Sequence, residues 1–170
     1  MNMEIGLSNT YVTNLCKKLM GSYFISTFPC DLLLEKTKTL ISKIKQDEGF
    51  SLAVNMSPSS FGGSHFIALS YRSNHLVLFD SLALPYKDPN INMFVQAIQK
   101  SCNVTFTSIP HQQQLQPFES LMCGYYVCAY CLHQSKNEES PKEFVKLFYE
   151  DKKKNDSVVI HYITDFISKL

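Results

Sequence analysis

The sequence predicts an α+β fold in which a central, mixed but mostly antiparallel sheet is flanked by helices. Short β-prone runs occupy the middle of the chain, and amphipathic helical patterns lie on either side of them. The 170 residues, 45% of them hydrophobic, are enough for one compact core. Since no repetitive, low-complexity or linker-like stretch divides the chain, we expect a single domain over residues 1–170.

The first part of the chain predicts two helices and a strand. Residues 10–20 place apolar side chains on one helical stripe, and Gly21 is expected to end this helix. Residues 31–45 form a second helical pattern, which is more polar and rich in lysine. Residues 50–56 are short, apolar and β-prone, and they predict the first strand.

The middle of the chain predicts a β-hairpin. A turn-rich loop at residues 57–64 precedes two strand-like runs, at 66–71 and 75–80. The tight turn at Arg72-Ser73-Asn74 joins these two runs. A short turn brings the end of the second strand beside the start of the first, so residues at these two positions are expected to meet.

The last part of the chain is mainly helical. The predicted elements are, in order, a helix at 91–101, a strand at 104–109, a polar, glutamine-rich loop at 111–122 and an apolar helix from Cys123 to about His133. The run Ser140-Pro141-Lys142-Glu143 is typical of a capped helix start. Asp156 is expected to cap a last helix that buries Val159, Ile163, Phe166 and Leu170.

Composition excludes several classes of function. A net charge of +1 shows no overall preference for nucleic acid, and the lysines at 36–45 and 152–154 are interpreted as solvated faces. The polar start predicts no signal peptide, and no apolar run approaches the roughly 20 residues needed to span a bilayer. The six cysteines are expected to be free thiols. We therefore expect an intracellular monomer that does not bind membranes.

Cys123 is the candidate nucleophile. It follows a polar loop and begins an apolar helix, and the positive end of a helix dipole favours a thiolate. The adjacent Gly124 would let the backbone approach a substrate carbonyl. Taken alone, Cys123 is equally compatible with a buried structural cysteine, the interpretation that fits Cys128 and Cys131 inside the same apolar helix.

Three further side chains fit a thiol-dependent site. His65 lies where a glycine turn meets an apolar strand, and it is the candidate general base. Asp80 ends the second hairpin strand and is expected beside His65, which it would orient. Gln116 precedes Cys123 and could donate to an oxyanion together with the Cys123 N–H. Each residue alone has an ordinary structural explanation, but their order in the chain favours a joint catalytic role.

The local sequences around these residues resemble those of the adenovirus endopeptidases (adenains) and, more broadly, the fold group that includes the SUMO-specific proteases. The matching segments are Ala53-Val54-Asn55, Gly62-Gly63-Ser64-His65-Phe66, Leu78-Phe79-Asp80, Gln116-Pro117 and Met122-Cys123-Gly124. The seven residues from Gln116 to Cys123 match the adenain spacing. The chain departs from the adenain pattern in two places, with Phe66 for the usual Trp and Asp80 for the usual Glu.

This resemblance implies a papain-like catalytic arrangement in the permuted order His-Asp-Gln-Cys. It implies a cysteine endopeptidase that cleaves viral or virus-like precursor proteins at glycine-containing sites, in the host nucleus or cytoplasm or within a virion. Gly62, Gly63 and Phe66 would line a narrow substrate cleft. The chemistry would need no cofactor. Adenains are activated by DNA and by a disulfide-linked peptide, so both are candidate partners, although the near-neutral charge and the position of Cys102 do not favour them.

Two other functions are compatible with the sequence. A protease of the same fold group could instead act on ubiquitin-like proteins such as SUMO. Alternatively, Cys128, Cys131 and His133 could belong to a zinc-binding interaction module. A structural zinc site needs a second, separated pair of ligands, which the apolar helix does not provide, so we expect no metal.

Overall fold

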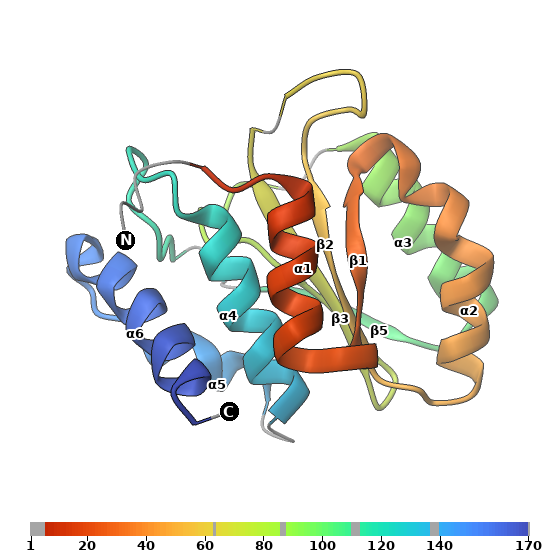
Figure 1. Ribbon diagram of the computed structural model, residues 1–170. Coiled ribbons are helices and arrows are strands. Elements are labelled where there is room, and N and C mark those ends of the chain that lie inside the picture. The colour runs from red at the N-terminus through yellow and green to blue at the C-terminus, as the bar shows by residue number, and fades with distance from the viewer. Residues whose placement is uncertain (1–5, 63, 86–87, 110–112, 137–139, 170) are drawn as a thin grey trace.

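A five-stranded mixed sheet forms the centre of the computed structural model, which describes residues 6–62, 64–85, 88–109, 113–136 and 140–169. The strands lie in the order β1-β2-β3-β4-β5. Helices cover both faces of the sheet and produce three layers, which are seen side by side in Figure 1. The predicted α+β class and mixed sheet are confirmed.

The five strands differ in direction between the centre and the edges of the sheet. Their bounds are β1 (Phe24–Pro29), β2 (Phe50–Asn55), β3 (Phe66–Arg72), β4 (His75–Phe79) and β5 (Thr105–Ile109). The pairs β2–β3 and β3–β4 are antiparallel, whereas β1 and β5 run parallel to their neighbours. The expected antiparallel pairing is thus confined to the centre. Strand β1, which no sequence pattern predicted, follows the first helix with only a short 3-10 turn between them.

The helices form two layers, each with its own hydrophobic core. One layer contains α1 (Asn9–Met20), α4 (Cys123–Lys136), α5 (Pro141–Val145) and α6 (Asn155–Ile167). The other contains α2 (Thr37–Lys45) and α3 (Pro89–Ser101). Helix α2 begins later than predicted, because residues 30–36 form two 3-10 turns instead. Among the described residues, no helix is long and apolar enough to cross a membrane.

Strand β3 shows how the sheet divides the two cores. Phe66 and Ala68 face the layer of α1 and α4, whereas Ile67 and Leu69 face the layer of α2 and α3. Both faces are covered, so the first four residues of the strand form a continuous apolar run without polar alternation. This explains why the sequence predicted a strand here but gave no indication of which side faces which helix.

The hairpin turn sets the relative positions of β3 and β4. Arg72 pairs with His75, and the two residues between them, Ser73 and Asn74, have positive φ angles of 47° and 62°. This backbone is that of the two-residue turns that match the natural twist of a hairpin. The predicted turn is confirmed, and it places the end of β4 close to the start of β3.

Helix α4 lies in the interior and is buried on nearly all sides. All of its residues from Gly124 to Gln134 are buried, and it contacts β3, α1 and α6. Tyr130 stacks on Phe79 with ring centroids 4.5 Å apart, and its hydroxyl hydrogen-bonds the Ser70 hydroxyl at 2.8 Å. These contacts pack the middle of the helix against the sheet.

Of the two helix caps predicted in the last part of the chain, the cap of α5 is confirmed and the cap of α6 is wrong. Ser140 caps α5, accepting a hydrogen bond from the Lys142 N–H at 3.4 Å. Asp156 does not cap α6, because that helix already begins at Asn155. The Asp156 carboxylate instead accepts a hydrogen bond from the Tyr126 hydroxyl at 3.0 Å, and so joins α6 to α4.

Candidate active site

The first residue of α4 meets the start of β3 at one end of the sheet, the upper end in Figure 1. A groove of about 440 Å³ lies at this junction, and we call it the active-site groove. Its described lining includes His65, Gln116 and Cys123. Three of the four residues predicted to be catalytic therefore share one concave surface, and the fourth, Asp80, contacts His65.

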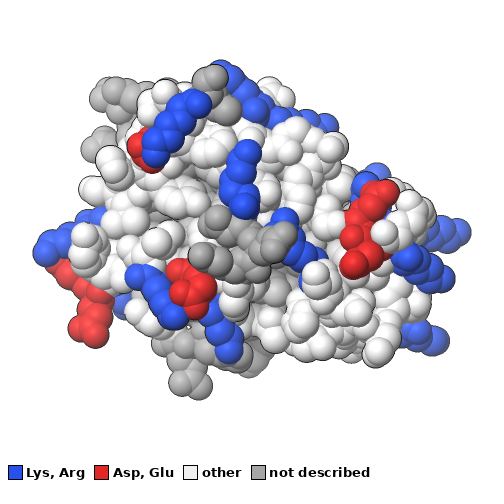
Figure 2. All heavy atoms as spheres, turned by 90° about the horizontal axis from the view of Figure 1, so that it is seen from below, with Lys and Arg blue, Asp and Glu red and all other residues white. Residues whose placement is uncertain are grey.

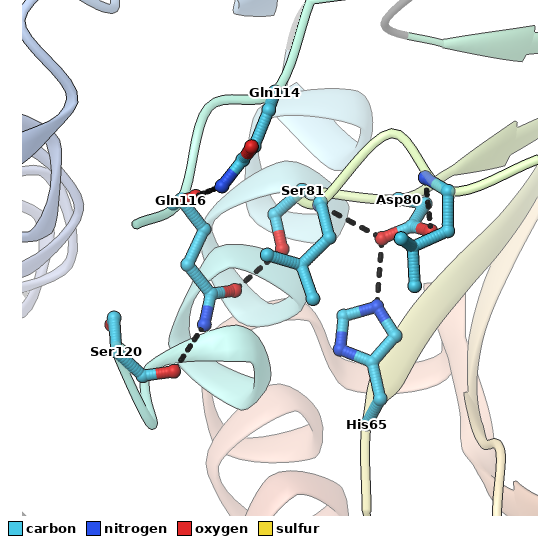
Figure 3. Close-up of polar contacts among 8 residues, drawn as sticks. His65, Asp80, Ser81, Gln114, Gln116 and Ser120 are labelled. Atoms are coloured by element: carbon cyan, nitrogen blue, oxygen red, sulfur yellow. Dashed lines mark hydrogen bonds and ion pairs between the residues drawn. The ribbon is translucent and has the colours of Figure 1, made fainter. Parts of the chain in front are cut away.

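His65 and Asp80 form a short, shielded pair. The His65 Nε2–H donates to Asp80 Oδ1 at 2.7 Å, with 13% of the histidine side chain and 4% of the aspartate side chain exposed (Figure 3). The same carboxylate accepts the N–H of Leu82 at 2.9 Å and of Leu84 at 3.2 Å. Buried charge is tolerated only when it is well paired, and these three donors supply the partners.

The backbone on both sides of this pair continues the sheet. The Met56 N–H donates to the His65 carbonyl at 2.8 Å, and the Asp80 N–H donates to the Ile109 carbonyl at 3.0 Å. Each residue thus lies one position outside a strand but is held by the hydrogen bonds of the ladder. The pair is positioned by rigid strands rather than by loops, as a preorganised site requires.

The surroundings of His65 favour its charged form. Burial lowers the pKa of its ring, but hydrogen bonds to Asp80 and to the Cys123 thiol, together with the negative charge of both groups, raise it to about 9. Since Asp80 occupies Nε2, the other ring nitrogen, Nδ1, is the one left for Cys123. At neutral pH the imidazole is therefore protonated between a carboxylate and the thiol group.

This shift predicts that His65 stabilises the fold in a pH-dependent way. Because the folded pKa of about 9 lies above the usual 6.5, the contribution is complete below pH 6.5 and is lost as pH rises through 9. A shift of this size corresponds to about 3 kcal/mol. We expect urea unfolding to show a stability advantage over His65→Gln that shrinks between pH 6.5 and pH 10. An advantage that stays constant across this range would contradict the assignment.

Cys123 is the first residue of α4 and is partly exposed. The N–H groups of Tyr125 and Tyr126 both donate to the Met122 carbonyl, so Cys123 lies inside the first turn. The unpaired N–H groups of a first turn and the helix dipole favour a negative charge at this position. The structure thus places the Cys123 thiol at the positive end of a helix, beside the protonated imidazole of His65.

Gln116 lies under the groove and is held on both sides of its amide. Its Oε1 accepts the Ser81 hydroxyl at 2.7 Å, and its Nε2 donates to the Ser120 carbonyl at 2.7 Å (Figure 3). Only 1% of the residue is exposed. A primary amide carries two N–H groups, so one of them remains available to a group bound in the groove.

The four residues predicted to bind substrate differ in their position relative to the active-site groove. Phe66 lines the groove, although it is almost completely buried. Gly62 is exposed and is not among the described lining residues, whereas Gly63 lies outside the described residues. A Cβ on Gly124 would be 3.1 Å from the Cβ of Leu7. The absence of a side chain at Gly124 therefore makes room for Leu7 of the N-terminal segment.

The N-terminal segment is part of the groove, although no sequence pattern predicted it there. Gly6, Leu7 and Ser8 all line the groove. Ser8 also caps α1, since its hydroxyl accepts the Tyr11 N–H at 3.2 Å. A serine before a helical pattern is a recognisable cap signal. It can locate the start of the helix, but nothing local indicates that this start lies beside the candidate nucleophile.

Asn55 connects this N-terminal region to the loop that carries His65. Its side-chain N–H donates to Asn9 Oδ1 at 2.8 Å, and its Oδ1 accepts the Ser57 N–H at 3.0 Å. Asn55 is buried and ends β2, opposite Phe66 on β3. Asn55, in the Val-Asn segment noted in the sequence, therefore joins the start of α1 to the backbone at both ends of the loop that precedes His65.

The other cysteines lie in the core or away from the groove. Cys16 Sγ donates to Cys128 Sγ at 3.3 Å, and both residues are buried, as are Cys30 and Cys131. Burial raises the pKa of Cys131. All six cysteines are free thiols, as predicted. No group of three or more His, Cys, Asp or Glu side chains in the described part of the chain could hold a metal ion.

Charged side chains do not gather into a single basic patch on the face opposite the groove. Figure 2 shows this face, on which lysine and arginine side chains are dispersed, acidic ones lie among them and wide areas are uncharged. A nucleic-acid surface usually requires clustered positive charge. This face therefore gives no support to DNA as a partner.

Comparison with known proteins places the chain by its fold. Neither a scan of protein families nor a search of curated protein sequences finds a match. Among solved structures, ASFV pS273R protease matches with a TM-score of 0.69 and 13% identity, over 93% of this chain and 67% of that chain. The central domain of Lpg1148 from Legionella pneumophila matches with a TM-score of 0.58 and 13% identity, over 96% of this chain and 97% of that domain. AvrA delL154 with IP6 and CoA matches with a TM-score of 0.54 and 16% identity, over 87% of this chain and 53% of that chain.

These similarities are similarities of fold, because all three identities are low. This chain, in which a sheet lies between two helical layers, is similar in fold to ASFV pS273R protease. The resemblance inferred from short sequence segments is therefore confirmed at the level of the fold.

Proposed function

We propose that this protein is a cysteine endopeptidase in which Cys123 is the nucleophile and His65 its acid–base partner. Asp80 orients His65, and Gln116 stabilises the oxyanion. The observation that carries this proposal is the 2.7 Å pair of His65 and Asp80 at the groove that also contains Cys123. Such an acid–imidazole–thiol arrangement is the one needed to activate a cysteine for acyl transfer. The fold shared with a viral protease supports it.

The proposed reaction proceeds through a thioester. The Cys123 thiolate attacks the carbonyl carbon of the scissile bond, and the carbonyl oxygen takes up the electron pair. The N–H groups of Gln116 and Cys123 stabilise this oxyanion. When the C–N bond breaks, His65 gives its proton to the leaving amine. Water then attacks the thioester while His65 removes its proton, the C–S bond breaks, and the acid product leaves with the thiol restored.

The raised pKa of His65 changes the role of this residue in the first step. The sequence alone suggested that His65 removes the Cys123 proton as a general base. With a pKa of about 9, the ring is already protonated before substrate binds at neutral pH. The main catalytic task of His65 in acylation is therefore to act as an acid toward the leaving group.

The proposed substrates are viral or virus-like precursor proteins cut beside glycine. Two apolar side chains, Leu7 and Phe66, line the groove close to Cys123. A narrow apolar groove admits a residue without a side chain more easily than a bulky one. The resemblance to adenains supports the same preference. All four reacting groups come from the chain, so we propose that the chemistry needs no cofactor.

A cleavage assay tests the proposed function. We expect the purified protein to cut peptides that contain Gly-Gly before the scissile bond, and to cut matched Ala-Ala peptides far more slowly. Fusions to the C-terminus of SUMO or ubiquitin, assayed in parallel, test the alternative of a ubiquitin-like-protein protease. Cleavage of these fusions alone would replace the proposed substrate class, and no cleavage of any substrate, with or without added DNA, would contradict the proposed activity.

Gln116→Ala should lower kcat by about 10²–10³-fold, because one oxyanion donor is lost. The control is Gln113→Ala, which removes an exposed amide from the same loop and should leave kcat unchanged. Alkylation of Cys123 by iodoacetamide does not create an oxyanion, so its rate should be similar in both variants. Unchanged turnover in Gln116→Ala would remove Gln116 from the mechanism.

A further inference from the structure

Ser81 directly follows Asp80 at the end of β4 and is completely buried, with 0% of its surface exposed. Its hydroxyl donates to Gln116 Oε1 at 2.7 Å. Its carbonyl accepts two backbone N–H groups, from Leu115 at 2.8 Å and from Gln116 at 3.0 Å. Ser81 therefore holds both the backbone and the side chain of a residue that lies 35 positions away in the sequence.

The contacts of Gln116 fix which way its amide faces. The Ser120 carbonyl can only accept a hydrogen bond, so Gln116 Nε2 has to face it, as Figure 3 shows. The Gln116 oxygen then faces Ser81, whose hydroxyl can donate. Because Gln116 is almost fully buried, removal of this hydroxyl leaves an acceptor with little access to solvent and no equivalent donor.

We propose that Ser81 is a positioning residue that holds the Gln116 amide with its free N–H directed at the oxyanion. This inference rests on the function proposed above. Ser81 and Asp80 are consecutive, and Asp80 pairs with His65. The end of β4 thus fixes the acid–imidazole pair with one residue and the oxyanion donor with the next. A shift of the strand end would disturb both halves of the site together.

The test compares Ser81→Ala with the wild-type protein in two reactions of Cys123. Peptide cleavage needs the oxyanion donor, whereas alkylation by iodoacetamide needs only the thiolate and His65. We expect Ser81→Ala to lower kcat by about 10-fold with little change in KM, less than the ~10²–10³-fold loss expected for the donor itself. The alkylation rate should stay within about two-fold of wild type, since a displaced amide does not affect thiolate formation.

A double-mutant cycle shows whether Ser81 acts through Gln116. In the Gln116→Ala background, Ser81→Ala should cause no further loss of kcat, because the group it positions is already absent. Independent, multiplicative losses would overturn the proposal. An alkylation rate that falls as far as kcat would also overturn it, because Ser81 would then act through the His65–Asp80 pair or through the fold.

The matched control is Ser70→Ala, which removes another buried serine hydroxyl, the one that bonds Tyr130, on the neighbouring strand β3. It should leave kcat unchanged. If Ser81→Ala does not fold, Ser81→Cys can replace it, because a thiol has a similar size and is a weak hydrogen-bond donor. This variant should show a smaller loss of kcat than the loss expected for Ser81→Ala. An unchanged kcat would count against the proposal. A wild-type protein that cleaves no peptide would overturn the proposed function and this inference with it, whereas normal cleavage by Ser81→Ala would overturn only the inference.

Discussion

Replacement of Cys123 by alanine is expected to abolish peptide cleavage, lowering kcat by at least about 10⁴-fold. The alanine has no nucleophile, so the thioester cannot form and only binding and the oxyanion donors remain. The effect should be confined to chemistry, because Cys123 is partly exposed and begins α4 rather than filling the core. Mass spectrometry should detect a covalent acyl-enzyme on wild type and none on the variant.

The control for this experiment is Cys102→Ala. Cys102 is the other partly exposed cysteine among the described residues, and it lies at the C-terminal end of α3, outside the described lining of the groove. Its removal should leave kcat unchanged. Full activity in Cys123→Ala, or equal losses in both variants, would refute the assignment of the nucleophile.

Replacement of Asp80 by asparagine is expected to lower kcat/KM by about 10²–10⁴-fold. The carboxylate accepts hydrogen bonds from His65, Leu82 and Leu84, and an amide has only one oxygen with which to replace its two. The change also removes the negative charge that raises the pKa of His65. We therefore expect this pKa to fall below 9, which NMR titration of the imidazole would measure.

Asp88→Asn is a matched control for the Asp80 variant. Asp88 also accepts two backbone N–H groups, from Asn90 and Ile91, but it does so as the cap of α3. Asparagine is an equally good cap, so this variant should keep both activity and stability. An unshifted pKa of His65 in Asp80→Asn, together with unchanged cleavage, would show that Asp80 does not orient the base.

The parts of the fold that were predictable are those whose signal is local. The hairpin follows from two apolar runs around a two-residue turn, and helix α1 follows from a 3.6-residue stripe that ends at a glycine. Gly21 separates strand β1 from α1, but the strand was missed because its buried positions do not alternate with the period of two that is typical of a strand. The start of α2 was misplaced because short 3-10 turns and an α-helix share similar local patterns.

The contacts of the candidate site also fall into two groups, those that a local sequence pattern could predict and those that depend on long-range packing. His65 and Asp80 belong to one hairpin, so their proximity could be expected from the sequence, and the structure places them 2.7 Å apart. The contact between Leu7 and Gly124 could not be expected, because it depends on how α1 and α4 pack together. The space beside Gly124 is filled by Leu7, which comes from the start of the chain.

The sequence by itself determined which side chains could carry the chemistry, because residue type and local context define a thiol at a helix start and a histidine beside an acid. Only the tertiary structure decided how these groups are held. Burial of α4 against β3 brings Cys123 to the end of the hairpin, and Ser81 reaches across 35 positions to hold Gln116. Such contacts depend on long-range packing, in which many apolar surfaces are buried at once, and no single segment encodes them.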